Sequence, residues 1–173
     1  MSTSNVEIQD LCQDLVPDFK HIHDCVFPVT FPPKFFREIF KTNGALNRIA
    51  LLHQQPVGVL SARILHTDNH GKGLYITSLG CKIHHRRKGI GSKLLQEATT
   101  FAKFQDCGHV FLHMQEGNEA LQFYLAAGFK IDRRIPNYYH RIEPSTALVL
   151  FKPLPWGWHF LPFCVVDREC ERR

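Results

Sequence analysis

A short basic stretch with two glycines is the part of the sequence whose residue types and spacing point most directly to chemistry. It reads Arg86-Arg87-Lys88-Gly89-Ile90-Gly91 and is expected to connect a strand to a helix. Glycines at such a turn let the backbone expose its N–H groups, and a helix N-terminus behind them adds about half a positive charge. The stretch could therefore hold a pyrophosphate. A solvated basic turn explains the same residues, because short Gly-x-Gly patterns are common, and spacing alone does not separate the two.

Two other polar groups carry weaker hypotheses. His66 and His70 flank Asp68 at a spacing that could bind a metal ion, but a flexible polar turn disfavours this, and we predict no metal. His84-His85, next to the basic stretch, also fits a nucleic-acid patch or a localisation signal. The six cysteines form no C-x-x-C pair, so we expect reduced thiols rather than a disulfide framework or a zinc site.

Hydrophobic periodicity predicts the elements that must position these residues. In the first half we expect a strand from Val6, helical spacing up to Val26, an aromatic loop at 27–31, a short helix at 34–40 and hairpin strands at 48–52 and 57–65. In the second half we expect a turn at 67–73, a strand at 74–80, a helix containing Leu94 to Ala102, a strand at 110–114, a helix at 119–127 closed by Gly128, and a strand at 147–151. This order predicts a mixed α/β chain with one sheet.

Composition sets the outer limits. The 173 residues have a mass of 20.0 kDa, of which 44% are hydrophobic and 21% charged, as in a single globular domain. A formal charge of +5 favours an anionic partner. No apolar run approaches the ~20 residues that span a bilayer, and the N-terminus lacks a signal-peptide pattern, so we expect a protein of the cytoplasm and nucleus.

The basic stretch also belongs to a wider family resemblance. Arg86-x-x-Gly89-x-Gly91 resembles the acetyl-coenzyme A loop of the GCN5-related N-acetyltransferases, and Phe123-Tyr124 with Gly128-Phe129 resembles their late helix. The resemblance covers about residues 6 to 152 and implies the GNAT acyl-CoA N-acyltransferase fold. That fold is a single α/β domain whose mixed, mostly antiparallel sheet is flanked by helices. It also implies that acetyl-CoA is the co-substrate and that no metal is needed.

Further blocks resemble the protein N-terminal acetyltransferases of the NatE (San) type. They are Phe27-Pro28-Val29, Leu74-Tyr75-Ile76, Leu79-Gly80-Cys81, Leu112-His113, Asn137-Tyr138-Tyr139 and Arg141-Ile142-Glu143-Pro144. Prolines at three positions resemble the NatF type instead; they are Pro32, Pro136 and Pro155. The implied activity is transfer of acetyl from acetyl-CoA to the α-amine of protein N-termini, which we expect to begin with Met and a hydrophobic residue.

The resemblance assigns roles residue by residue. Tyr75 and His113 would remove the proton of the substrate ammonium, and Tyr124 would protonate the departing thiolate; taken alone, Tyr75 and His113 would be read as core side chains. The positions implied to bind acetyl-CoA are Leu79, Gly80, Cys81, Arg86, Arg87, Lys88, Gly89, Ile90, Gly91, Ser92, Asn118 and Tyr124. Those implied to contact the peptide are Phe27, Pro28, Val29, Phe31, Thr77, Tyr138, Tyr139 and Ile142.

The chain departs from the family pattern at two places. Phe31 stands where these enzymes have a tyrosine that bonds the substrate backbone, so that contact is missing or replaced. The segment before Phe123 is one residue shorter than in NatE enzymes, which puts the coenzyme contact of Asn118 in doubt and makes Gly117 an alternative. Both departures keep open a weakly active docking subunit, and a lysine or small-amine acetyltransferase of the same fold is the other alternative.

Partners and location follow from the same resemblance. NatE enzymes associate with the NatA catalytic and scaffold subunits on the ribosome, and coenzyme A phosphates explain the basic stretch without direct nucleic-acid binding. We place the acetyltransferase domain at residues 1–154 and an aromatic C-terminal tail at 155–173. The tail packs on the domain, binds a partner or contacts a membrane; its prolines disfavour the last reading, which would place the chain on the cytosolic face of the Golgi membrane, as in NatF enzymes.

Overall fold

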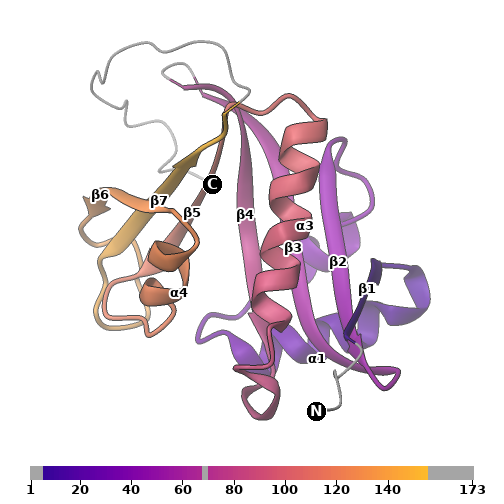
Figure 1. Ribbon diagram of the computed structural model, residues 1–173. Coiled ribbons are helices and arrows are strands. Elements are labelled where there is room, and N and C mark those ends of the chain that lie inside the picture. Colours follow the sequence, from indigo (N-terminus) through magenta and orange to yellow (C-terminus); the bar gives the residue numbers. More distant parts are fainter. Residues whose placement is uncertain (1–5, 68–69, 156–173) are drawn as a thin grey trace. The chain divides into compact units, whose positions relative to one another are not determined.

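The computed structural model describes residues 6–67 and 70–155, and these form seven strands and four α-helices (Figure 1). The elements in chain order are β1 (Val6–Asp10), η1 (Gln13–Leu15), α1 (Val16–Val26), α2 (Pro33–Glu38), β2 (Ala45–Leu52), β3 (Gln55–Thr67), β4 (Gly71–Cys81), η2 (Ile83–His85), α3 (Ile90–Phe104), β5 (His109–Gln115), α4 (Leu121–Ala126), β6 (Lys130–Ile135) and β7 (Ala147–Pro153).

The strands are hydrogen-bonded neighbours in the order β1-β2-β3-β4-β5-β7-β6. The pairs β1/β2, β2/β3, β5/β7 and β6/β7 are antiparallel. Neighbours β4 and β5 are joined through α3, the helical crossover that parallel strands require. The sheet is therefore mixed and mostly antiparallel, as expected.

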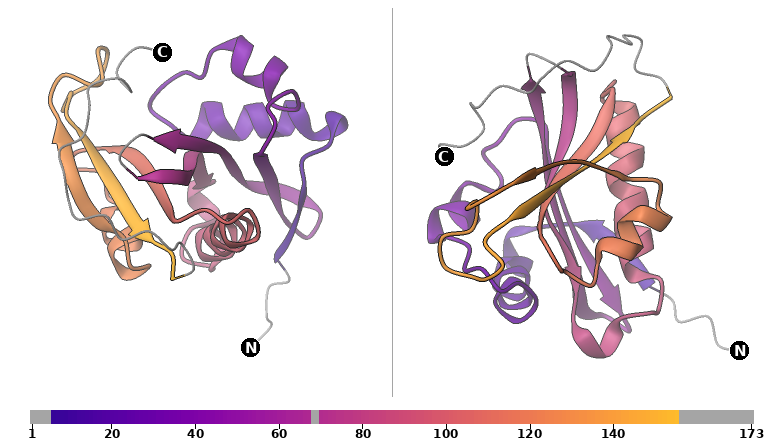
Figure 2. Two further views of the ribbon diagram at one scale, coloured as in Figure 1. Left: turned by 90° about the horizontal axis from the view of Figure 1, so that it is seen from above. Right: turned by 90° about the vertical axis from the view of Figure 1, so that its left-hand side faces the viewer.

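The chain divides into two compact units, which we describe separately. The first contains Met1–Arg63 and Ile76–Phe101. In this unit α1 and α2 lie on one side of β2 and β3, and most of α3 lies on the other (Figure 2, left). Alternation along the strands produces these layers: Ile49 and Val59 pack with α1 and α2, whereas Arg48 pairs with Glu97 of α3.

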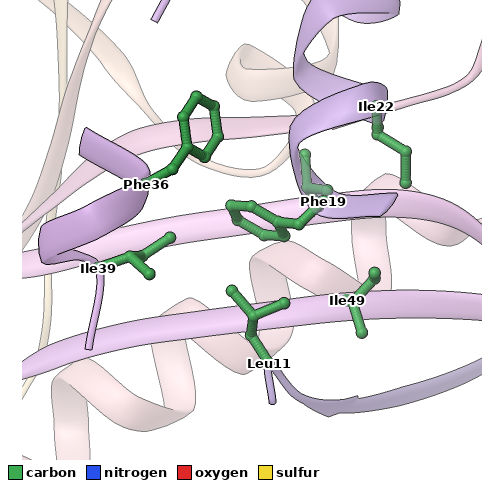
Figure 3. Packing of buried hydrophobic residues seen from close by; sticks show 7 residues of the cluster. Leu11, Phe19, Ile22, Phe36, Ile39 and Ile49 are labelled. Carbon is green, nitrogen blue, oxygen red and sulfur yellow. The ribbon is translucent and has the colours of Figure 1, made fainter. Parts of the chain in front are cut away.

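Seven buried residues form the core beneath α1 and α2 (Figure 3). Phe19 and Ile22 of α1 are both fully buried, and they meet Phe36 and Ile39 at the end of α2. Burying a side chain of this size contributes about 1.5 to 3 kcal/mol. This core fixes the position of the loop between α1 and α2, which carries the predicted peptide contacts Phe27 to Phe31.

The second unit contains Ile64–Tyr75 and Ala102–Arg173, of which residues 156–173 lie outside the described part. Its strands are the end of β3, the first half of β4, and β5, β7 and β6. In β7, Val149 pairs with His113 of β5 on one side and with Arg133 of β6 on the other. The β6 register shifts between Ile131 and Arg133, which leaves Asp132 in a β-bulge.

The structure corrects four sequence expectations. Strand β6 was not predicted, and β4 begins at Gly71 instead of Leu74. The helix expected at 34–40 is Pro33–Glu38. The helix expected at 119–127 is only Leu121–Ala126, because the Asn118 side-chain oxygen accepts a hydrogen bond from the Ala120 amide and holds the preceding residues in a turn. Gly128 closes it as predicted, at φ +87°.

Candidate active site

The second unit brings the two predicted catalytic side chains into contact. The rings of Tyr75 on β4 and His113 on β5 lie edge to face, with centroids 5.5 Å apart. Tyr75 also contacts Phe111, two residues before His113 on the same face of β5, at 5.1 Å. The phenol and the imidazole are thus held side by side on a rigid sheet, as a shared role in proton transfer requires.

Burial keeps His113 neutral at physiological pH. Loss of hydration, with a smaller contribution from the positive charge of Arg133, lowers the pKa of His113 to about 4. Its Nδ1 is buried and has no hydrogen-bond partner among the described residues. A neutral imidazole with an unpartnered nitrogen can accept a proton from an acceptor amine or from a water between them.

Aromatic side chains after β6 enclose the same histidine. The Tyr138 ring stacks on His113 with centroids 4.9 Å apart and planes 7° from parallel, and Tyr139 meets Tyr138 edge to face. Ile142 is half-buried in the same loop, and the Tyr139 amide donates to the Ser145 carbonyl. The structure therefore places Tyr138 directly against the predicted base and Tyr139 next to Tyr138.

The first unit contains the remaining predicted peptide contacts. The rings of Phe27 and Phe31 lie 5.5 Å apart, and both contact His23, a residue that the sequence analysis overlooked. Pro28 is exposed, while Val29 and Thr77 are half-buried. Phe31 is therefore packed edge-on against an imidazole, in the position where the family pattern has a tyrosine.

His23 links α1 to β4 in this unit. The residue is 1% exposed, its Nδ1 lies 2.8 Å from the Phe19 carbonyl oxygen, and its Nε2 lies 2.8 Å from the Ser78 hydroxyl. Burial lowers the pKa of His23 to about 4, so the ring is neutral. Its spacing of four residues from both Phe19 and Phe27 is the signal that places it on the buried face of α1.

The basic glycine loop has the backbone expected of an anion site. It joins β4 to α3 through η2, its side chains from Arg86 to Lys88 are exposed, and Arg87 and Gly89 have φ values of +63° and +78°. The helical ladder of α3 begins with the Lys93 amide donating to the Gly89 carbonyl. The amides before Lys93, including those of Ile90, Gly91 and Ser92, precede that ladder and are the groups a phosphate would meet. These residues fit the pyrophosphate of a coenzyme.

Two further predicted coenzyme contacts lie in the second unit. Tyr124 on α4 is 6% exposed, and burial raises the pKa of its phenol far above the ordinary value, so the hydroxyl stays protonated. Asn118 is exposed, but its Oδ1 is already bonded to the Ala120 amide, while Gly117 before it has φ +80°. Leu79, Gly80 and Cys81 end β4 in the first unit, where a Cβ on Gly80 would overlap Val26.

The remaining expectations concern a metal site, a membrane-spanning helix and the C-terminal tail. Among residues 6–67 and 70–155, no group of three His, Cys, Asp or Glu side chains could hold a metal ion; Asp68 of the His66–His70 turn lies outside this part. No helix in the same residues is long and apolar enough to cross a membrane. The aromatic tail beyond Pro155 also lies outside the described residues.

Comparison with known proteins identifies the family. Residues 16–129 match the acetyltransferase (GNAT) family. N-alpha-acetyltransferase 50 of Danio rerio is 36% identical over 151 residues, which cover 86% of this chain and 89% of that protein. The probable N-acetyltransferase san of Drosophila melanogaster is 36% identical over 156 residues, covering 89% and 84%.

Solved structures agree with this result. Arabidopsis thaliana Naa50, in complex with a bisubstrate analogue, superposes with a TM-score of 0.77 at 29% identity, over 86% of this chain and 99% of that one. Arabidopsis thaliana NAA60 with acetyl-CoA shares the fold, with a TM-score of 0.76 at 18% identity over 87% of this chain and 100% of that one. The chain belongs to the acetyltransferase (GNAT) family and is similar over most of its length to N-terminal acetyltransferases of the NatE (San) type.

Proposed function

We propose that this N-terminal acetyltransferase moves acetyl from acetyl-CoA to protein N-termini that begin with Met followed by a hydrophobic residue. The observation that carries the proposal is the array of Tyr75, His113 and Tyr138 in the second unit, in which a neutral imidazole lies between a phenol and an aromatic wall. The 36% identity to the Danio rerio enzyme supports the choice of an α-amine acceptor.

Proton removal would fall to Tyr75 and His113. An α-amine has a pKa near 8, so about one molecule in ten is neutral at pH 7. When that nitrogen attacks a carbonyl carbon it becomes far more acidic, and a neutral base beside it can then take its proton. His113 is in this neutral form at pH 7, since burial lowers its pKa to about 4, and for the same reason it passes an accepted proton on to solvent. Tyr75 would orient the amine, or a water that carries the proton onward.

The glycine loop and Tyr124 would serve the acetyl donor. Bound acetyl-CoA supplies the activated acetyl group and a thiolate leaving group. Arg86 to Lys88 and the first amides of α3 would bind its pyrophosphate, and the amide near Leu79 would polarise the thioester carbonyl. Tyr124 is expected to donate its proton to the thiolate, since burial keeps the phenol protonated at neutral pH.

Apolar side chains support the choice of peptide. The predicted peptide contacts include the rings of Phe27 and Phe31 in one unit and of Tyr138 and Tyr139 in the other. Glu143, in the loop after Tyr139, already accepts a hydrogen bond from the Ser145 amide. An apolar first pair of residues therefore fits better than a basic side chain.

The direct test is an acetylation assay with acetyl-CoA on four acceptors: peptides beginning Met-Leu, Met-Lys and Ser-Glu, and one with an internal lysine and a blocked N-terminus. We expect the Met-Leu peptide to have the highest kcat/KM. Faster acetylation of the internal lysine would favour a lysine acetyltransferase. Tight coenzyme binding without turnover of any acceptor would also contradict the proposal.

A weakly active docking subunit is the second candidate, and one observation favours it. The Asn118 oxygen accepts a hydrogen bond from the Ala120 amide, so this side chain is already engaged in a local turn. Such a subunit would bind coenzyme A weakly and turn over slowly. Calorimetric titration with acetyl-CoA separates the two, since a dissociation constant far above the substrate range of an active enzyme would favour docking.

The cellular part of the proposal follows the NatE resemblance. We propose association with the NatA catalytic and scaffold subunits at the ribosome, in the cytoplasm and nucleus. Affinity purification of the full-length chain should recover both subunits. Cell imaging of the full chain beside a chain ending at Leu154 tests the Golgi alternative, which predicts a membrane signal that is lost with the tail.

A further inference from the structure

A row of three side chains crosses the strands that carry the proposed base. His113 of β5 pairs with Val149 of β7, and Val149 pairs with Arg133 of β6. Residues directly opposite one another in antiparallel strands point to the same face of the sheet. His113, Val149 and Arg133 therefore share one face, and neighbouring strands are about 5 Å apart.

The β6 bulge sets this arrangement. Ile131 pairs with Leu150 and Arg133 with Val149, so the two β6 residues face opposite sides although they are two apart in sequence. In a regular strand they would share a face. Asp132, the extra residue, turns Arg133 toward the His113 side, and bulges commonly re-aim side chains in this way beside active sites.

The guanidinium of Arg133 is incompletely neutralised. Its side chain is 31% exposed, so most of it is covered, and its ion pair with Asp132 spans 3.9 Å, at the outer limit of such contacts. The residue between it and His113 on this face is Val149, a small and buried side chain. The charge of Arg133 lowers the pKa of His113, which places the cation within electrostatic reach of the imidazole.

We propose that Arg133 is a specificity-determining residue, whose positive charge makes the acceptor site prefer peptides with an acidic residue directly after the Met-hydrophobic pair and disfavour those with Lys or Arg there. This inference rests on the proposed function, because it assumes that the α-amine is delivered beside His113. The same charge disfavours the ammonium form of the substrate, which must lose its proton before it attacks.

Arg134 provides the matched control. It precedes Ile135 on the same strand, is 67% exposed, and pairs with Glu116 at 3.3 Å. It pairs with Leu148 in the register, so it points to the sheet face opposite Arg133. Replacing Arg134 removes the same charge from the same strand without removing a charge from the His113 face.

The test compares three peptides that begin Met-Leu and differ only at the third residue, which is Glu, Gln or Lys. Two charges separated by about two strand spacings, in a medium of intermediate dielectric, should change kcat/KM by about five- to tenfold. The wild type should therefore show that ratio of kcat/KM for the Glu peptide over the Lys peptide. Arg133→Gln should bring the ratio to within about twofold of one, and Arg133→Glu should invert it. Arg134→Gln should leave the ratio as in the wild type.

Ionic strength gives a readout that a merely structural role would not move. Raising it from about 0.05 to about 0.5 M should shrink the wild-type ratio, because salt screens partly exposed charges, and should leave the Arg133→Gln ratio unchanged. Equal rates for the wild type on all three peptides, or equal changes in Arg133→Gln and Arg134→Gln, would overturn the role of Arg133 while leaving the proposed function standing. If the wild type acetylates none of the Met-Leu peptides, both fall.

Discussion

At the scale of single residues, the decisive property is the charge state of His113. A buried, neutral imidazole that contacts Tyr75 and stacks on Tyr138 has lost most of its conformational freedom. At neutral pH this base is already in its unprotonated form when the substrate binds. Aromatic contacts hold the ring on two sides, and no described residue bonds its Nδ1.

Removing either proton-handling group should slow the chemical step. General acid–base groups contribute roughly 10² to 10⁴ in rate, so we expect Tyr75→Phe and His113→Ala each to lower kcat by about 100-fold or more. The KM for acetyl-CoA should change little, because the pyrophosphate loop is untouched. Steady-state kinetics on a Met-Leu peptide measures both quantities.

Arg134→Gln is the control for this prediction. Arg134 is 67% exposed and lies on the sheet face opposite Arg133, so the kcat of this variant should stay within a few-fold of the wild type. Wild-type turnover in both Tyr75→Phe and His113→Ala would refute the assignment of the base.

At the scale of elements, a single hydrogen-bonded histidine joins α1 to β4. His23 contacts five phenylalanines, Phe19, Phe27, Phe31, Phe35 and Phe36. It also bonds Ser78, immediately before Leu79, the residue whose amide we assign to the thioester carbonyl. The helix before the peptide loop is thereby tied to the strand that polarises the donor.

We expect His23→Ala to lower the free energy of unfolding by about 3 kcal/mol, because it leaves a cavity among aromatic rings and an unpaired Ser78 hydroxyl. His21→Ala on the exposed face of the same helix should change it by less than about 0.5 kcal/mol. Urea unfolding followed by circular dichroism measures both values. Equal stability of the two variants would show that the link contributes nothing.

At the scale of the whole molecule, buried histidines couple folding to pH. His23 and His109 are 1% and 3% exposed, and burial lowers the pKa of each to about 4; for His109 the neighbouring His70 adds to this. An unfolded histidine titrates near 6.5. At pH values between these two pKa values, the histidines are protonated in the unfolded chain but not in the folded chain.

The folded chain should therefore lose stability as the pH falls. Above about pH 7.5 the histidines are neutral in both states and stability hardly depends on them. As the pH falls from about 7.5 toward about 4, the unfolded state is stabilised, so the free energy of unfolding should decrease by about 2.4 kcal/mol per pH unit near pH 5 from His23 and His109 together. His113 adds to the decrease. Urea unfolding at closely spaced pH values between 6.5 and 5 measures the slope, and a flat profile there would contradict the burial of these side chains.

Comparison of sequence and structure shows what local pattern can predict. Helix α3 has apolar residues at helical spacing, and strands β5 and β7 are short apolar runs; all three were predicted near the observed positions. Strand β6 was missed because it lies at a sheet edge, carries only two apolar residues, Ile131 and Ile135, and is interrupted by a bulge that breaks its alternation.

In the site too, groups that are neighbours in the chain could be predicted and groups that the fold brings together could not. The glycine loop was visible from local spacing, because all its groups are neighbours in the chain. Tyr75 and His113 are far apart in the sequence, and only the family pattern paired them; their contact depends on strand order, which periodicity does not encode. Arg133 had no signal at all, since its orientation depends on an unpredicted strand and an unpredicted bulge.

The bulge at Asp132 also has an evolutionary consequence. If the strand after Ile131 moved along by one residue into a regular register, Asp132 would pair with Val149 and Arg133 with Leu148, without any change in the base or in a helix. A family could thus reverse the charge that its substrates meet through a register change at a sheet edge. Among relatives of this enzyme, differences in the register of this strand would then separate substrate preferences that comparison of catalytic residues does not distinguish.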